Sequence, residues 1–220
     1  MCDKHPHIRA EVLNLFSTPA RIILAGSSNS GKSHLCDYLI RQYHHHFTRI
    51  IICGVSSHPV EECPAIKPKL VLSPDLIDPS DYQTSSNEPV LLIIDDLYIE
   101  ALSSATVCQI FTRGRHKNLS TILISQNIFP RGRFARDVSL NASHFILTRV
   151  RDVSSVETLG RQLFGGKKAK TFLEIYNKCM ASRSYAHLLI DLAPNTPEII
   201  QLRTNLNRQD GDYEIVYQGC

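Results

Sequence analysis

Residues 21–47, RIILAGSSNSGKSHLCDYLIRQYHHHF, decide the fold of this 220-residue chain. The apolar run Ile22–Ala25 has the length and branching of a buried strand. Residues 26–33, GSSNSGKS, match the complete phosphate-loop pattern G-x-x-x-x-G-K-[ST]. Beyond the loop, apolar residues recur at every fourth position with two more beside them, which predicts an amphipathic helix: Leu35, Leu39, Tyr43, Phe47, Cys36 and Ile40.

The predicted strand and helix on either side give the loop the context that a nucleotide site needs. Glycines let successive backbone N–H groups point at phosphate oxygens, and the helix N-terminus adds partial positive charge. Lys32 is predicted to reach the β- and γ-phosphates, and the Ser33 hydroxyl to ligate Mg²⁺. The predicted nucleotide-binding residues are Gly26, Ser27, Ser28, Asn29, Ser30, Gly31, Lys32, Ser33 and His34.

A second apolar run, Val90–Ile94, is followed directly by two carboxylates, Asp95 and Asp96. Five consecutive apolar residues predict a strand that is buried on both faces, as in a parallel sheet. Ligands of open α/β sheets bind where such strands end. This is a Walker B pattern: Asp95 is predicted to hold Mg²⁺, and Asp96 to orient or deprotonate the attacking water.

Leu119–Ser125 predicts another buried strand, and it ends on Gln126. A polar amide at this strand tip is expected near the γ-phosphate, where it could sense hydrolysis by hydrogen bonding to water or phosphate. Alone, a Gln after a strand is more often a cap or turn residue, so the order of the elements carries this prediction.

Composition is that of an ordinary globular protein, with 43% hydrophobic residues, 20% charged residues and a net charge of +3. The seven cysteines are scattered and form no C-x-x-C pair, so neither a disulfide framework nor a zinc site is expected. The N-terminal residues MCDKHPHIRAEV lack the apolar core of a signal peptide, and no run approaches the length of a membrane span. We therefore expect an intracellular protein with no membrane partner.

The remaining patterns predict one α/β domain over residues 20–205, with an N-terminal arm at 1–19 and a C-terminal tail at 206–220. His44–His46 is interpreted as a solvated helix end rather than a metal site. Further strands are expected at 49–53, 70–72, 144–147 and 186–192. Helices are expected at 97–116, 153–164 and 167–180, and a loop or short helix at 75–89.

Basic residues dominate residues 113–151, where Asp137 is the only acid: Arg113, Arg115, Lys117, Arg131, Arg133, Arg136, Arg149 and Arg151. This bias indicates contact with phosphate, of nucleotide or of nucleic acid, although a solvated basic face is the simpler alternative. Arg113 and Arg115 lie between the two predicted strands that end on Asp95 and Gln126, where an arginine could reach the nucleotide of a neighbouring subunit.

With these motifs in place, the chain resembles the viral genome-packaging ATPases of the FtsK–HerA superfamily, the group that includes poxvirus, Polinton and adintovirus members. The resemblance covers residues 22–205 and rests on GSSNSGKS, on LLIIDDL and above all on FTRGRHKNLSTILISQNIFPRGRFARDVSLNASHFIL, residues 111–147. It implies a three-layer α/β P-loop NTPase of the additional-strand, RecA/FtsK-like type, with a mainly parallel central sheet flanked by helices. It also implies an extra strand between the Walker A and Walker B strands.

The same resemblance implies an enzyme, an ATPase that uses ATP and Mg²⁺ to pump double-stranded DNA into a preformed capsid. Its expected partners are DNA, a ring of identical subunits (hexamer or pentamer) and a capsid or portal-like protein. Its expected location is an assembly site in the host cytoplasm or nucleus, with association with the virion also open. No separate DNA-binding or nuclease domain is expected, so genome selection would depend on other proteins.

By resemblance, Lys32 and Ser33 are Walker A residues, Asp95 and Asp96 the Walker B pair, and Gln126 the sensor. Arg115 is the first choice for an arginine finger acting in trans, and Arg113 the second. Residues 130–136, PRGRFAR, are a candidate DNA grip through Arg131, Arg133 and Arg136. One departure is that many relatives carry Glu where this chain has Asp96, whose side chain is one methylene shorter.

Three alternatives stay open from the sequence. A nucleotide or small-molecule kinase would explain Lys32 and Asp95, but it explains Asp96 and Gln126 less well. A nucleotide-bound structural subunit with little turnover need not retain all of Lys32, Ser33, Asp95 and Asp96. A helicase or conjugation-type DNA pump shares the motor and differs in its track and partners.

Overall fold

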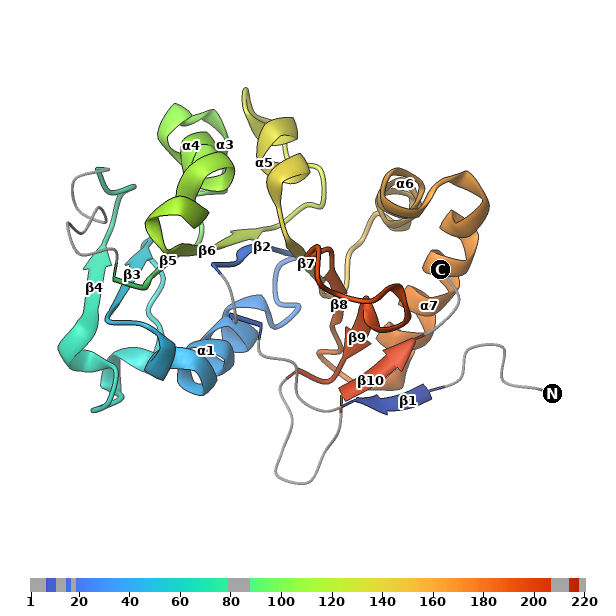
Figure 1. The fold of residues 1–220 in the computed structure, drawn as a ribbon, viewed down its shortest axis with the longest axis horizontal. Helices are drawn as coiled ribbons and strands as arrows, with labels where there is room; N and C mark the ends of the chain where they lie inside the picture. Colours follow the sequence, from blue (N-terminus) through green and yellow to red (C-terminus); the bar gives the residue numbers. More distant parts are fainter. Residues whose placement is uncertain (1–6, 11–14, 17–18, 79–87, 207–213, 218–220) are drawn as a thin grey trace.

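The computed structural model describes residues 7–10, 15–16, 19–78, 88–206 and 214–217. These residues form one ten-stranded sheet with helices on both faces, which confirms the predicted three-layer α/β fold (Figure 1). The loop or short helix expected at 75–89 lies largely outside the described residues.

Six strands of the sheet run parallel. Five of them are mostly buried on both faces, as parallel strands require, whereas β4 at the outer edge is partly exposed. Their spatial order is β4 (Leu70–Ser73), β3 (Arg49–Cys53), β5 (Val90–Ile94), β6 (Leu119–Ser125), β2 (Arg21–Ala25) and β7 (His144–Leu147). Strand β6 thus lies between the strand before the phosphate loop and the strand before Asp95. The extra strand that the resemblance implied is confirmed.

Four antiparallel strands extend the sheet beyond β7. They are β8 (Leu188–Asp191), β9 (Leu202–Thr204), β10 (Glu214–Tyr217) and β1 (His7–Ala10). Residues 7–10 and 214–217, which the sequence assigned to the arm and the tail, therefore both add strands to the sheet.

Alternate residues of the strands enter two separate apolar clusters, one on each face of the sheet. Ile22 and Leu24 face α1 (Lys32–Tyr43), whereas Ile23 and Ala25 belong to the cluster on the other face. The helices that contribute to this second cluster are α3 (Tyr98–Ser103), α4 (Ala105–Arg113), α5 (Ala135–Asn141), α6 (Val153–Phe164) and α7 (Gly166–Ser182). Short 3-10 turns connect the elements: His44–His46, Pro59–Glu62, Lys67–Lys69, Gly114–Lys117 and Glu198–Ile200.

The single helix expected over residues 97–116 is wrong. The structure has two helices, α3 and α4, because Ser104 adopts an extended backbone conformation (φ −87°, ψ 122°) between them. Its hydroxyl accepts a hydrogen bond from Val107 N at 3.4 Å and so caps α4. The first helix also ends earlier than the pattern suggested, at Tyr43, and Phe47 is buried from an extended position beyond the 3-10 turn.

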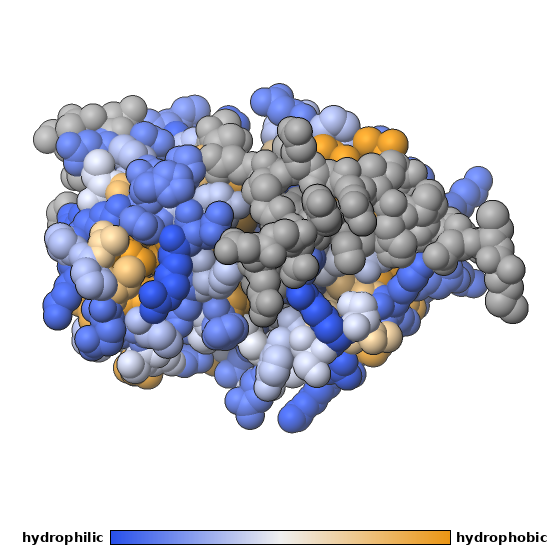
Figure 2. Space-filling view, turned by 90° about the horizontal axis from the view of Figure 1, so that it is seen from below, coloured by the Kyte–Doolittle hydropathy of each residue, from blue (hydrophilic) through white to orange (hydrophobic). Residues whose placement is uncertain are grey.

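The surface agrees with a globular protein of mixed charge. Figure 2 shows one face that is largely hydrophilic, with its apolar residues in separate small patches. No helix within the described ranges has the length and apolar character to cross a membrane. The five cysteines that the structure describes are free thiols: Cys36, Cys53, Cys63, Cys108 and Cys179.

Candidate nucleotide and metal site

The phosphate loop lies between the end of β2 and the start of α1, at the edge of the sheet where the parallel strands end (Figure 1). Asn29 and Gly31 have left-handed backbones, with φ of 60° and 88°, so the chain curls before the helix begins. Lys32 Nζ donates to Ser27 O at 2.9 Å, which holds the ammonium over this curl. Burial lowers the pKa of Lys32, and the charges of Asp95 and Asp96 oppose that shift. The loop has the form of an anion cradle.

Thr148, which the sequence did not single out, supports the loop from the end of β7. Its Oγ1 lies 2.6 Å from Ser30 Oγ. A Cβ at Gly26 would lie 1.8 Å from the same Thr148 oxygen, so only glycine fits at position 26. The threonine directly follows β7, the neighbour of β2, and only the folded sheet reveals that the two segments meet.

The structure brings together Ser33 and Asp95, the two residues predicted to ligate Mg²⁺. Ser33 Oγ donates to Asp95 Oδ2 at 3.0 Å, and Asp95 is buried. Burial raises the pKa of Asp95, as does the charge of Asp96, while the Ser33 hydrogen bond and His58 lower it. Both partners offer oxygen, the ligand atom that Mg²⁺ prefers, so the donor set fits this ion.

Asp96 lies beside this pair with an exposed carboxylate that accepts a hydrogen bond from Ser56 Oγ. Its backbone is left-handed, with φ of 59°. Asp and Asn adopt this conformation far more readily than Glu does. The backbone therefore gives a physical reason for the shorter acid at this position.

His58 is a part of the site that the sequence analysis missed. Its ring is buried between two carboxylates: Nδ1 lies 2.9 Å from Asp37 Oδ1, and Nε2 lies 3.5 Å from Asp95 Oδ2. Burial alone would lower the pKa of His58, but Asp37, Asp95 and Glu61 outweigh it and the pKa is raised. Asp37 comes from α1 and His58 from the β3–β4 connection, so no sequence pattern joins them.

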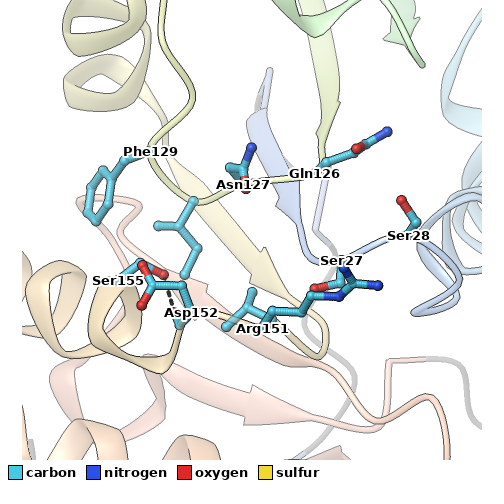
Figure 3. Close-up of a pocket in the computed structure, with 10 residues that line it drawn as sticks. Ser27, Ser28, Gln126, Asn127, Phe129, Arg151, Asp152 and Ser155 are labelled. Carbon is cyan, nitrogen blue, oxygen red and sulfur yellow. Dashed lines mark hydrogen bonds between the residues drawn. The ribbon is translucent and has the colours of Figure 1, made fainter.

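Gln126 directly follows β6 and lines a cavity of about 290 Å³ together with Ser27 and Ser28. Figure 3 shows its amide directed toward the side on which Ser28 lies, and Arg151 beside Ser27. Because β6 pairs with both β2 and β5, Gln126 stands between the phosphate loop and the two aspartates. The sensor role predicted for Gln126 remains a prediction.

Arg113 and Arg115 lie at the N-terminal ends of the parallel strands, whereas the phosphate loop lies at their C-terminal ends. Both arginines are exposed. Burial is the main cause that lowers the pKa of Arg21, the first residue of β2, and the charge of Arg115 lowers it further. Arg21 in turn donates from Nη1 to Phe111 O at 3.2 Å. A five-residue strand spans about 15 Å, so neither arginine reaches the nucleotide site of its own chain.

The basic segment 130–136 follows β6 and runs into the first turn of α5, at the same end of the strands as the phosphate loop. Arg131, Arg133 and Arg136 are exposed. The loop is fixed to the end of α3, since Phe134 N donates to Leu102 O at 2.9 Å and a Cβ at Gly132 would meet that same oxygen at 2.8 Å.

Comparison with known proteins gives two kinds of relative and no matching family model. The DNA packaging protein OPG160 of monkeypox virus is 26% identical over 195 residues, which are 80% of this chain and 63% of that protein. For OPG160 of vaccinia virus (strain Copenhagen) the identity is also 26%, over 70% of its length. The match thus spans less than two thirds of the monkeypox protein.

Among solved structures, the genome packaging NTPase B204 of Sulfolobus turreted icosahedral virus 2, in complex with ATP-γS, has a TM-score of 0.59 at 18% identity. The superposition covers 85% of this chain and 96% of B204. The DNA-packaging ATPase B204 of Sulfolobus turreted icosahedral virus gives 0.54 at 15% identity, over 84% and 95% of the two chains.

In sequence this chain is similar to a viral DNA packaging protein, and it shares the P-loop fold of a viral genome packaging NTPase. The resemblance to viral packaging ATPases is thus supported in sequence by OPG160 and in fold by B204. The structure brings the phosphate loop, the Ser33–Asp95 pair and Asp96 together in that fold, and their roles in binding and hydrolysing a nucleotide remain predictions.

Proposed function

We propose that this protein is an ATP-driven motor that translocates double-stranded DNA into a viral or virus-like capsid. The observation that carries the proposal is the Ser33–Asp95 hydrogen bond of 3.0 Å below Lys32, with Asp96 exposed beside it. This arrangement suits a metal-assisted transfer of phosphoryl to water. The names of the relatives, DNA packaging protein and genome packaging NTPase, support DNA as the track, and the capsid is part of the proposal.

In the proposed reaction, backbone N–H groups of residues 26–33 bind the β- and γ-phosphates, and Lys32 exchanges Ser27 O for a phosphate oxygen. Ser33 and Asp95 would hold Mg²⁺, which neutralises charge on the phosphates when it is bound. Asp96 orients water for attack on the γ-phosphorus, and Gln126 responds to the loss of the γ-phosphate.

The assembly we propose is a homo-oligomeric ring, hexameric or pentameric, working at a virus assembly site in the host cytoplasm. Arg115, with Arg113 as the second choice, would stabilise the transition state in a neighbouring subunit, because both lie too far from their own phosphate loop. Arg131, Arg133 and Arg136 would grip DNA phosphates without reading sequence.

The decisive test is ATP hydrolysis with and without double-stranded DNA, with assembly followed by light scattering in the same samples. Lys32→Ala and Asp96→Asn should abolish turnover, whereas Lys170→Ala, an exposed lysine on α7, should not. DNA-stimulated turnover confined to the assembled form supports the motor. Phosphate release that is indifferent to DNA and assembly would contradict it and would favour a phosphotransferase.

The arginine finger needs a mixing experiment. Arg115→Ala subunits, inactive alone, should regain turnover when mixed with Lys32→Ala subunits, because each mixed interface can combine an intact phosphate loop with an intact arginine. Arg161→Ala, which removes an exposed arginine of α6, is the matched control and should stay active. Absence of complementation would exclude a role in trans for Arg115 and direct the same test to Arg113.

A further inference from the structure

A second hollow adjoins the phosphate loop on the side away from Asp95. It has a volume of about 510 Å³ and is lined by three segments: Ser27–Ser30, Arg149–Arg151 and Ser184–Ala186. Arg149–Arg151 follows β7, and Ser184–Ala186 precedes β8. In the sheet, β7 and β8 lie on one side of β2, and β6 and β5 lie on the other. Because β8 is antiparallel, its start lies at the same sheet edge as the end of β7.

Tyr185 forms the wall of this hollow nearest to the phosphate loop. A Cβ added to Gly31 would lie 3.0 Å from Tyr185 Cδ1, so the tyrosine packs directly against the loop at a position that admits only glycine. The side chain is nevertheless 67% exposed. One edge of the ring is therefore fixed at the loop, while most of its surface is open to the hollow.

The backbone of Tyr185 is left-handed, with φ of 56°. A bulky residue rarely adopts this conformation, and such strain concentrates at ligand sites. Asn or Gly would relieve the strain, but neither would present an aromatic surface. An exposed aromatic ring held in a costly conformation beside an anion cradle is what a planar ligand attached to phosphate requires.

The direction of a bound nucleotide can be argued from the metal pair. Lys32, Ser33 and Asp95 hold the β–γ end of the triphosphate on the side of β6 and β5. The α-phosphate and the nucleoside must then leave on the other side of the loop, toward β7 and β8. That side carries the hollow and Tyr185.

We propose that this hollow is the nucleoside subsite and that the base stacks on Tyr185; the inference rests on the proposed nucleotide chemistry. Arg149, whose Nη2 donates to Met180 O at 2.9 Å, holds this wall in place, and Arg151 extends along Ser27, as Figure 3 shows. Stacking accepts every base but gives the larger purine surface the greater contact, so the site favours purine nucleotides without a strict choice of base.

The experiment compares ADP with inorganic tripolyphosphate by calorimetric titration, in wild type and in two Tyr185 variants. Tyr185→Asn removes the ring but tolerates the left-handed backbone, and Tyr185→Phe keeps the ring. Tyr185→Asn should weaken ADP about tenfold, the loss of one stacked base, and leave tripolyphosphate affinity unchanged. Tyr185→Phe should bind ADP and tripolyphosphate as tightly as wild type does. Wild type should also prefer ADP and GDP to CDP and UDP, and this preference should be smaller in Tyr185→Asn.

Two results would overturn the proposal. If Tyr185→Asn lowers the affinities for ADP and tripolyphosphate equally, the ring only supports the phosphate loop. If Tyr185→Asn leaves the affinity for ADP unchanged, the base does not stack on this ring. Lys32→Ala provides the reference for a phosphate-side defect, because it should weaken both ligands. Wild type that binds ADP through Tyr185 but does not hydrolyse ATP would contradict the motor and leave the nucleoside subsite standing.

Discussion

The hydroxyl of Ser33, on the first turn of α1, donates to the carboxylate of Asp95 at the end of β5 across 3.0 Å. Two segments far apart in the sequence thus place side by side the two oxygen atoms that are proposed to ligate Mg²⁺. The hydrogen bond also helps to orient both groups, together with His58, whose Nε2 lies 3.5 Å from the same carboxylate oxygen.

The first prediction concerns this pair. Ser33→Ala should lower the affinity for Mg²⁺ in the presence of nucleotide by roughly 10-fold to 100-fold, since it removes a ligand and frees Asp95. Titration of Mg²⁺ against hydrolysis rate and against nucleotide binding measures the effect. Ser30→Ala is the matched control, because its hydroxyl is bonded to Thr148 and not to Asp95. Equal Mg²⁺ dependence in the two variants would exclude Ser33 as a metal residue.

The second prediction concerns the length of the acid at position 96. Asp96→Asn should stop hydrolysis but keep nucleotide affinity and thermal stability, because Asn tolerates a φ of 59° as Asp does. Asp96→Glu should lower the free energy of unfolding by about 1 kcal/mol, since a longer residue fits the left-handed backbone less well. Urea unfolding and single-turnover hydrolysis separate the two effects. A stable and fully active Asp96→Glu variant would show that the backbone does not select the shorter acid.

The third prediction concerns His58, which bridges Asp37 and Asp95 inside the protein. Its replacement by Ala leaves two buried carboxylates without their shared partner, so the free energy of unfolding should fall by about 3 kcal/mol. Hydrolysis should fall with it, through a raised requirement for Mg²⁺. The double variant His58→Ala/Asp37→Asn should lose less than the sum of the single losses, because it also removes one of the stranded charges. Additive losses would mean that the two residues do not act as a unit.

The sequence allowed most of the fold to be predicted, because its signals are local. Residues 90–94 are an unbroken apolar run, and residues 119–125 are mostly apolar or β-branched. The structure makes strands of those same residues. Residues 153–164 carry a clear helical period, and the helix has these bounds. The break at Ser104 was missed although Ser-Ser-Ala-Thr is a capping sequence, because the apolar period continues across it.

The site was predictable only as far as its residues are consecutive. GSSNSGKS and the two aspartates carry their chemistry in their order along the chain. His58, Thr148 and Tyr185 reach the same site from the β3–β4 connection, the end of β7 and the α7–β8 turn, and nothing near them in the sequence indicates it. Their roles depend on which strands are neighbours, a property of the whole sheet.

The last prediction concerns acid stability and a buried histidine remote from the chemistry. His187 is 1% exposed, and its Nε2 accepts a hydrogen bond from Leu206 N at 2.8 Å. Burial and the charge of Arg183 lower its pKa from 6.5 to about 3. The unfolded chain therefore binds a proton below pH 6.5 that the folded protein refuses until about pH 3, and stability falls as the pH falls through this window.

At pH 4.5 the loss attributable to His187 should be about 3 kcal/mol relative to pH 7.5. Urea unfolding of wild type and His187→Asn at the two pH values measures it, and the fall in stability on acidification should be smaller in the variant by that amount. His58 acts in the opposite sense, because its pKa is raised and its contribution to stability is retained in acid. The contribution of His187 is therefore isolated by comparing the variant with wild type, not by the wild-type curve alone. His116→Asn, which replaces an exposed histidine, should leave the fall unchanged. An identical fall in His187→Asn and wild type would mean that His187 takes up its proton without unfolding the protein.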